Sequence, residues 1–136
     1  MNKGQSLFEV LVAVSIIALI LVGVVSLSSR TVSVSRVSRD NSLATGHAQD
    51  AMEWLRTQRD EDWANLKDNL GNSCINTLGT WGSFPCSSTI TGTPFSREVN
   101  INETSPGIMV VTVTVRWTDG SGSHNVTSTT RFTDWR

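Results

Sequence analysis

The sequence predicts an α+β fold in which one long N-terminal helix packs on a small antiparallel β-sheet. Three patterns lead to this prediction. Residues 10–29 carry no charged side chain, and 15 of these 20 residues are apolar. Small and apolar residues then recur at helical spacing as far as Leu55. Finally, the segment Ile108–Trp117 alternates between apolar and polar residues, which is the period of a half-buried strand.

The bulk composition limits the class of protein. A chain of 136 residues has room for one domain, or for one domain with an appendage. Its 11 basic and 12 acidic residues leave a net charge of −1, so no global field attracts nucleic acid. With 38% hydrophobic residues and two cysteines, the chain is neither collagen-like, nor a polar disordered chain, nor a disulfide-dense mini-protein.

The uncharged segment 10–29 is expected to be a transmembrane helix. Twenty helical residues span about 30 Å, the thickness of the hydrocarbon core of a bilayer. Ser15 and Ser26 can bond back to their own helix, and a segment that is apolar on every face fits a buried core helix poorly. A cleaved secretory signal is the main alternative. It needs a shorter apolar run and a small-residue cleavage site, which Ser26-Leu27-Ser28 imitates weakly.

Glu9 places a carboxyl group at the leading edge of this apolar helix. An ionisable residue within a membrane span is costly, and it is therefore a candidate functional residue. Alternatively, the carboxylate reaches the headgroup layer, because it lies close to the start of the helix. The position alone favours neither interpretation.

The residues around Glu9 carry a specific signature. The string KGQSLFEVLVA, residues 3–13, resembles the type III signal of the type IV pilin superfamily. The resemblance implies a leader peptide of residues 1–4, with cleavage by prepilin peptidase after Gly4 and methylation of the new N-terminal residue, Gln5. Glu9 then becomes the fifth residue of the mature chain, the position at which the family has glutamate. The departure is Gln5 itself, where the family most often has phenylalanine.

The same resemblance implies a function and a set of partners. It implies the pilin fold and a structural subunit of a type IV pilus-like filament, in which the amine of one subunit pairs with Glu9 of another. The implied partners are other pilin subunits, prepilin peptidase and the inner-membrane assembly platform, with no cofactor. The N-terminus is implied to be cytoplasmic. The globular part of the chain that follows the anchor, which we call the head, is implied to be extracytoplasmic and later part of an extracellular or periplasmic filament. The charges that flank the span oppose this orientation, since Lys3 precedes it and Arg30, Arg36 and Arg39 follow it. We give the more specific signature precedence.

Residues 30–59 are expected to continue the helix as an amphipathic segment. Together with the transmembrane helix of residues 5–29, they predict one helix from about Ser6 to Gln58, on the order of 80 Å long. Its serine-rich neck, around residues 33–38, predicts a soft joint. The apolar stripe expected to face the domain comprises Val34, Val37, Ala44, Ala48, Ala51, Met52 and Leu55.

Residues 60–96 are expected to form a loop region, because glycine and proline recur throughout this stretch. Cys74 and Cys86 lie within it, 12 positions apart. In an extracytoplasmic domain we expect them to form a disulfide, the alternative being two free buried thiols. A metal site is disfavoured because no further cysteine or nearby histidine completes four ligands. The acidic run Asp60-Glu61-Asp62 lacks the spacing of a calcium loop and is expected to be a solvated helix end.

Residues 97–136 are expected to form a three-stranded antiparallel meander. The predicted strands are Arg97–Glu103, Ile108–Trp117 and Asn125–Phe132. Ser105-Pro106-Gly107 and Asp119-Gly120-Ser121-Gly122 are the predicted turns. In the central strand, one face is expected to be apolar, made of Val111, Val113, Val115 and Trp117.

The chain shows no catalytic signature, and we expect it not to be an enzyme. His47 and His124 are the only histidines, and solvated or capping roles are the default for both. Among the five tryptophans, Trp81 lies between the cysteines in a glycine-rich loop, close to Phe84. An exposed aromatic there would suit contact with a partner, and simple packing of the loop is the alternative. No basic residue lies between Lys67 and Arg97, which disfavours nucleic-acid binding by this loop.

Three classes of function therefore compete. The chain most resembles minor pilins of the PilV kind, and the alternative within the same class is a minor pseudopilin of a type II secretion system. A second class is a tip adhesin that presents the Cys74–Cys86 loop. A membrane-anchored enzyme is disfavoured, because the head lacks clustered titratable residues.

Overall fold

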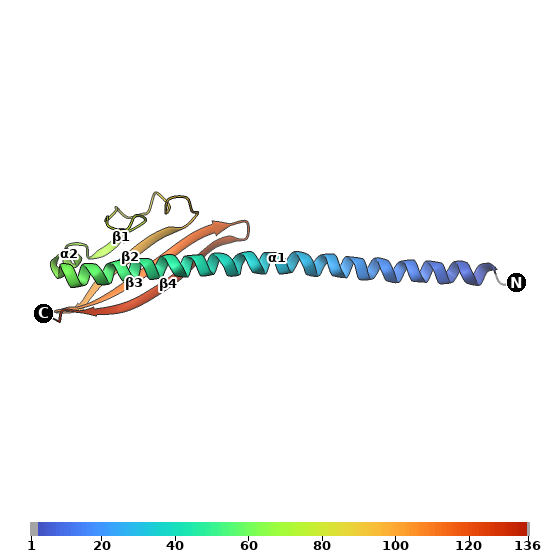
Figure 1. The fold of residues 1–136 in the computed structure, drawn as a ribbon, viewed down its shortest axis with the longest axis horizontal. Coiled ribbons are helices and arrows are strands. Elements are labelled where there is room, and N and C mark those ends of the chain that lie inside the picture. The colour runs from blue at the N-terminus through green and yellow to red at the C-terminus, as the bar shows by residue number, and fades with distance from the viewer. Residues whose placement is uncertain (1–2, 136) are drawn as a thin grey trace. The chain divides into compact units, whose positions relative to one another are not determined.

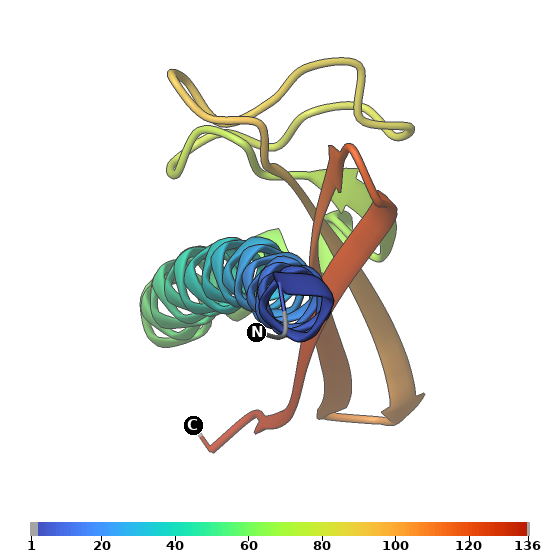
Figure 2. The same cartoon turned by 90° about the vertical axis from the view of Figure 1, so that its right-hand side faces the viewer.

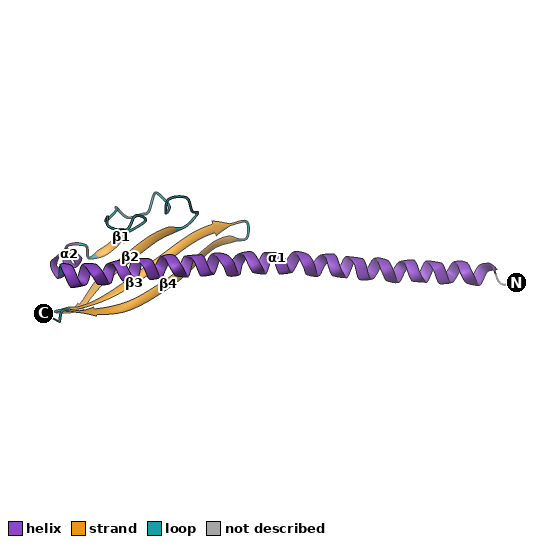
Figure 3. Ribbon diagram, in the orientation of Figure 1, coloured by secondary structure: helices purple, strands orange, loops and turns teal. Residues whose placement is uncertain are grey.

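The computed structural model describes residues 3–135, and the side chains of residues 3–6, 28–30 and 33 are outside that description. It contains two helices and four strands in this part of the chain (Figures 1 and 3). They run in the order α1 (Lys3–Glu61), α2 (Trp63–Asp68), β1 (Gly71–Cys74), β2 (Ser96–Ser105), β3 (Ile108–Asp119) and β4 (Gly122–Thr133). The chain divides into two compact units, Met1–Arg39 and Asp40–Arg136.

The predicted long helix is confirmed and is slightly longer at both ends than the sequence indicates. Helix α1 continues without a break through Gly23 and through the serine-rich neck. The soft joint at the neck stays a prediction. Asp62 ends α1 and caps α2, where its carboxylate accepts hydrogen bonds from the backbone N–H groups of Ala64 at 3.0 Å and Asn65 at 3.2 Å. The acidic run is thus a helix boundary.

The second unit is an antiparallel sheet with its own part of α1, residues 40–61, against one of the sheet's faces (Figure 2). Its strand order is β1-β2-β3-β4, so each strand pairs with its neighbour in sequence. The three predicted strands are confirmed as β2, β3 and β4, joined by tight turns at Pro106-Gly107 and Gly120-Ser121. Gly107 has a φ of 76°, which a type II turn with proline before it requires of its third residue.

The predicted number of strands was wrong, because the sheet has four strands and not three. A fourth strand, β1, lies within the predicted loop region and pairs with residues 98–101 of β2. Its sequence, Gly71-Asn72-Ser73-Cys74, offers no apolar alternation. It forms because β2 presents an open edge to which a short extended segment can bond. The rest of residues 75–95 is loop, apart from one isolated bridge between Cys74 and Gly82.

The core lies between α1 and the sheet. As predicted, the apolar face of β3 is buried, and so are the stripe positions Ala44, Ala48, Ala51, Met52 and Leu55. The first part of the predicted stripe was wrong, because Val34 is 68% exposed and Val37 is only half-buried. Val34 belongs to the first unit, whereas the alanines at 44, 48 and 51 lie in the second. Their small side chains allow a close approach to the sheet. The buried cluster consists of Ala44, Ala48, Ala51, Met52, Leu55, Leu66, Ile75, Phe95, Val99, Ile101, Met109, Val111, Val113, Val115, Trp117 and Phe132.

Candidate functional site

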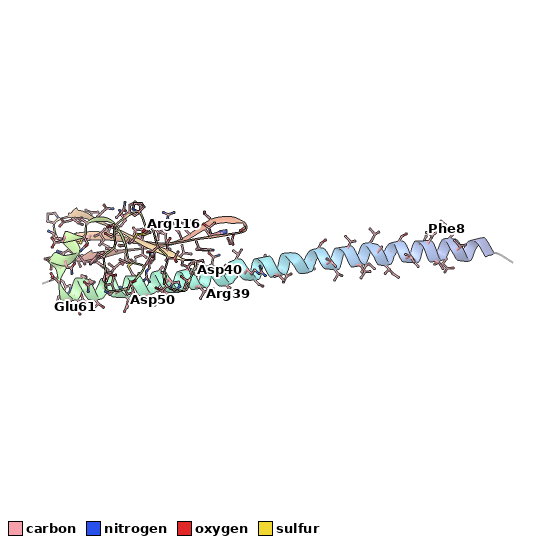
Figure 4. All side chains as sticks on the ribbon, turned by 90° about the horizontal axis from the view of Figure 1, so that it is seen from above. Phe8, Arg39, Asp40, Asp50, Glu61 and Arg116 are labelled. Atoms are coloured by element: carbon pink, nitrogen blue, oxygen red, sulfur yellow. A yellow bond between two sulfur atoms is a disulfide. The ribbon has the colours of Figure 1, made fainter. Side chains whose placement is uncertain are left out.

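The N-terminal part of α1 presents an apolar surface on all sides. Within the described residues, Leu7–Leu27 is the one helix segment long and apolar enough to span a membrane. An 18-residue window of this segment has a mean hydropathy of 3.1, and none of the segment's side chains is buried within the chain. Phe8 and the residues after it project freely (Figure 4). Such a surface needs lipid or other protein to cover it.

Glu9 lies on one face of this helix. Val12, Ala13 and Ile16 follow it at spacings of three, four and seven, so the four side chains lie along one side. Together with Phe8 they line a shallow depression around the carboxyl group. Residues 7–27 contain no basic side chain, so burial of this carboxylate in lipid or protein requires a compensating charge from elsewhere or a proton.

Two hydroxyl groups of α1 are satisfied within the helix itself. As predicted, the Ser15 hydroxyl donates a hydrogen bond to the carbonyl oxygen of Leu11 at 2.8 Å. The hydroxyl of Thr31 likewise donates to the carbonyl oxygen of Leu27 at 3.0 Å. Such back-bonding removes the need for an external partner in an apolar environment. Glu9 differs from these two hydroxyl residues, because no basic residue between positions 7 and 27 can neutralise it.

The two predicted processing residues are less fully described. The backbone of Gly4 and Gln5 belongs to α1, but their side chains lie outside the described residues. The scissile bond between them stays a prediction.

The predicted disulfide is confirmed. Cys74 and Cys86 are bonded, with their Cα atoms 5.5 Å apart. Inside the ring that they close, the backbones of Cys74 and Gly82 exchange two hydrogen bonds of 2.9 and 2.7 Å. A Cβ atom at Gly82 would lie only 3.1 Å from the carbonyl oxygen of Cys74, so glycine permits this close approach. The loop is therefore held both covalently and by its backbone, and it also contains the cis peptide bond Phe84–Pro85.

The two aromatic residues predicted for partner contact differ in their environment. Trp81 is half-buried and packs on Trp54 of α1, with the ring centroids 5.0 Å apart. Trp81 therefore packs the loop on the helix, which was the alternative to a partner contact. Phe84 is 47% exposed, and Leu78 in the same loop is 43% exposed. A partner contact, if this loop makes one, would rest on these two residues.

A buried arginine that the sequence analysis missed holds the loop to the helix. The guanidinium of Arg97, on β2, donates from Nε to the carbonyl oxygen of Ile75 at 2.8 Å. It also donates from Nη1 to the carbonyl oxygen of His47 on α1 at 2.9 Å. Burial lowers the pKa of Arg97, and attraction to Asp50 opposes that effect. Composition gives no signal for this contact, because the partners are backbone atoms 22 and 50 positions away.

A polar cluster at the β3–β4 turn was also missed. The Asp119 carboxylate accepts hydrogen bonds from the hydroxyl of Ser121 at 2.6 Å and from its backbone N–H at 2.7 Å. These bonds, followed by the one with His124 at 3.1 Å, lower the pKa of Asp119 to about 2. His124 also stacks on Trp117, with the ring centroids 5.4 Å apart. The cluster caps the turn.

This cluster does not have the geometry of a catalytic triad. Ser121 and Asp119 both contact the same nitrogen of His124, Nε2, each at 3.1 Å. A relay needs the nucleophile and the carboxylate on opposite ring nitrogens. A neighbouring cleft of about 540 Å³ is lined mainly by hydroxyl and amide groups. Among the described residues, no group of three or more His, Cys, Asp or Glu side chains is placed to hold a metal ion.

Comparison with known proteins identifies the N-terminal segment. Residues 1–25 match the family described as the prokaryotic N-terminal methylation motif. The chain therefore carries a type IV pilin-like prepilin signal, the substrate signal of prepilin peptidase, and the apolar helix segment that overlaps this signal has the character of a single-pass anchor. No curated protein and no solved structure matches the chain.

Proposed function

We propose that the chain is a structural subunit of a type IV pilus-like filament on a bacterial surface, and specifically a minor pilin. The observation that carries the proposal is Glu9. It is the only charged residue between Gln5 and Ser29, and it lies on a helix that needs a cover on all sides. A filament of packed N-terminal helices provides that cover. The small head and the serine-rich neck favour a minor subunit over a major one.

The proposed mechanism of assembly uses the amine that processing creates. Cleavage after Gly4 leaves a positive α-amino group on Gln5, four residues before Glu9. A carboxylate in an apolar environment is stabilised strongly by a paired cation and is costly alone. The amine of one subunit therefore pairs with Glu9 of its neighbour, and this pair sets the register in which the two helices dock. Before assembly the helix is a membrane anchor, with its N-terminus in the cytoplasm.

The proposal assigns no catalytic role and no cofactor to the head. The Asp119–Ser121–His124 cluster supports this, because its shared ring nitrogen stabilises a turn and does not activate the hydroxyl. A minor pseudopilin of a type II secretion system would use the same helix and the same pair. A tip adhesin is favoured by one observation, the exposure of Leu78 and Phe84 in the disulfide loop.

The first experiment measures the mass and the N-terminal residue of the mature protein from the native host. We expect a chain that begins at Gln5 and carries one added methyl group. A chain that begins at Met1, or beyond Ser28, contradicts the proposal. In sheared filaments we expect the protein to be much less abundant than another pilin, and dominance over that pilin would contradict the minor role.

The second experiment tests Glu9 directly. Glu9→Ala should be processed and inserted in the membrane normally, but its recovery in filaments should fall about tenfold or more, because the neighbour's amine loses its partner. Val12→Ala is the matched control, since it shortens an apolar side chain on the same face of the helix and leaves the carboxylate in place. Normal co-assembly of Glu9→Ala would refute the mechanism.

A further inference from the structure

The two edge strands of the sheet differ in length and in how far they are covered. Strand β1 forms one edge, has only four residues, and is covered at Cys74 by its bridge to Gly82. Strand β4 forms the other edge and pairs with β3 along all 12 of its residues. Among the described residues, the backbone hydrogen bonds of β4 lead only to β3. The second edge is therefore long and open.

The turn that joins β3 to β4 determines which backbone groups face outward. Asp119 and Gly122 face each other across a two-residue turn and form a hydrogen-bonded pair. From this pair onward, hydrogen-bonded and non-hydrogen-bonded pairs alternate along the two strands. The register of β3 with β4 contains no bulge that would interrupt this alternation. The residues of β4 that turn their N–H and C=O groups outward are Asn125, Thr127, Thr129 and Arg131.

Two side-chain contacts agree with this phase. The hydroxyls of Thr112 and Thr129 lie 3.2 Å apart, and those of Thr114 and Thr127 lie 3.4 Å apart. Side chains approach more closely at pairs whose backbones do not bond each other. Thr127 and Thr129 thus bond β3 through their hydroxyls and leave their backbone groups free.

This edge lacks the features that protect exposed strands from pairing. Proteins blunt an open edge with proline, lysine, a bulge or a very short strand. Strand β4 contains no proline and no lysine, its register is unbroken, and it is as long as β3. Its one permanently charged residue is Arg131. An edge of this kind is a template for strand addition.

The core-facing side of β4 is also incompletely covered. Val126, Ser128 and Thr130 are only half-buried, whereas their partners on β3 are fully buried. Those partners are Val115, Val113 and Val111, respectively. The core-facing side chains of β4 are thus less covered than those of β3, and the side chains of a further strand would cover them.

We propose that the outer edge of β4 binds an extended polypeptide segment of a different subunit of the same filament, which adds to the sheet as a fifth strand. A row of N–H and C=O groups at the repeat of a strand is complementary to another extended backbone and to no small ligand. The added segment alternates between apolar residues toward the core and uncharged polar residues beside Thr127 and Thr129. The identity of the partner as another subunit rests on the proposed function, in which a minor subunit has other subunits as neighbours.

The binding test uses the mature full-length chain in lipid nanodiscs. The probe is a synthetic peptide with the residues of β3, Ile108–Thr118, flanked by lysines for solubility. This peptide has the alternation that the edge requires, because β3 already pairs with the other side of β4. Hydrogen exchange followed by mass spectrometry should show amide exchange within residues 123–133 slowed about tenfold, with no change in β1.

Matched variants locate the contact. Thr129→Pro removes an outward N–H and should abolish the protection, whereas Thr129→Val loses the same hydroxyl contact, keeps the N–H, and should retain it. A peptide of the same sequence with every backbone nitrogen methylated should fail on the wild-type chain. This experiment uses only the wild-type chain, so its result does not depend on whether a variant folds.

Three results of the peptide experiments would overturn the proposal: no protection by the β3 peptide, equal protection by the methylated peptide, or equal protection in a folded Thr129→Pro variant. If the nanodiscs instead hold two copies of the chain, with β4 protected in the absence of peptide, the partner is a second copy and the proposal fails. These readouts need no filament. They are therefore independent of the processing and co-assembly experiments that test the proposed function.

Discussion

Replacing Arg97 with methionine tests whether the head depends on one buried cation. Arg97 is 3% exposed, and its guanidinium joins β2 to α1 and to the chain after β1. Methionine keeps an unbranched apolar side chain but removes all five N–H donors. The carbonyl oxygens of Ile75 and His47 would lose the bonds at 2.8 and 2.9 Å.

The magnitude follows from these contacts. A hydrogen bond to a charged group contributes about 1.5–3 kcal/mol, so the two short bonds together contribute about 3–6 kcal/mol. Desolvation of the guanidinium, the main cause of its lowered pKa, offsets part of this gain. We expect Arg97→Met to lower the free energy of unfolding of the head by about 2–4 kcal/mol. For a unit of this size, that corresponds to a fall in Tm of about 10–25 °C.

The assay is thermal unfolding of the mature chain in detergent micelles, followed by tryptophan fluorescence. Arg116→Met is the matched control, because the Arg116 side chain is 57% exposed and its ion pair with Glu98, at 2.6 Å, lies on the surface. An exposed ion pair contributes about 1 kcal/mol or less. If Arg97→Met lowers the Tm no more than Arg116→Met does, the buried hydrogen bonds of Arg97 do not stabilise the head as proposed.

Two further predictions concern the disulfide and the turn. Replacing both Cys74 and Cys86 with serine should cost about 2–3 kcal/mol, because it frees a ring in the unfolded chain, and the Tm measured with and without reductant checks this. A wild-type Tm that is insensitive to full reduction would contradict it. The Asp119 carboxyl should titrate near its folded pKa of about 2, which NMR of the side-chain carbon measures. Since its folded pKa lies below the unfolded value of about 3.9, its contribution to stability is present above about pH 4 and is lost as the pH falls toward 2. Asp119→Asn should lack this acid-dependent loss, and equal acid sensitivity in the two proteins would exclude the mechanism.

The local elements of the fold were predictable because each depends on a short pattern. The apolar run, the alternation in β3 and the two turns use only neighbouring residues, and all three agree with the structure. Strand β1 was not predictable in this way. Four polar or small residues have no strand period of their own, and they become extended because the edge of β2 offers hydrogen bonds.

The same distinction applies to the candidate site. Glu9 is recognisable from the sequence because a single charge within an uncharged helix stands out whatever the rest of the chain does. The environment of Trp81 was undecided, since packing and exposure suit the same glycine-rich loop. The structure places it on Trp54, 27 positions away, and leaves Phe84 exposed.

The sequence by itself determined the anchor, the prepilin signal and the position of its one carboxylate, because the exposure of side chains on a lone helix follows from local composition. Tertiary structure alone decided that Arg97 is buried, that the disulfide loop rests on the helix, and that β4 is an open edge. Each of these depends on contacts between segments far apart in the chain. No local period encodes such contacts, because their energy comes from the partner that folding brings into place.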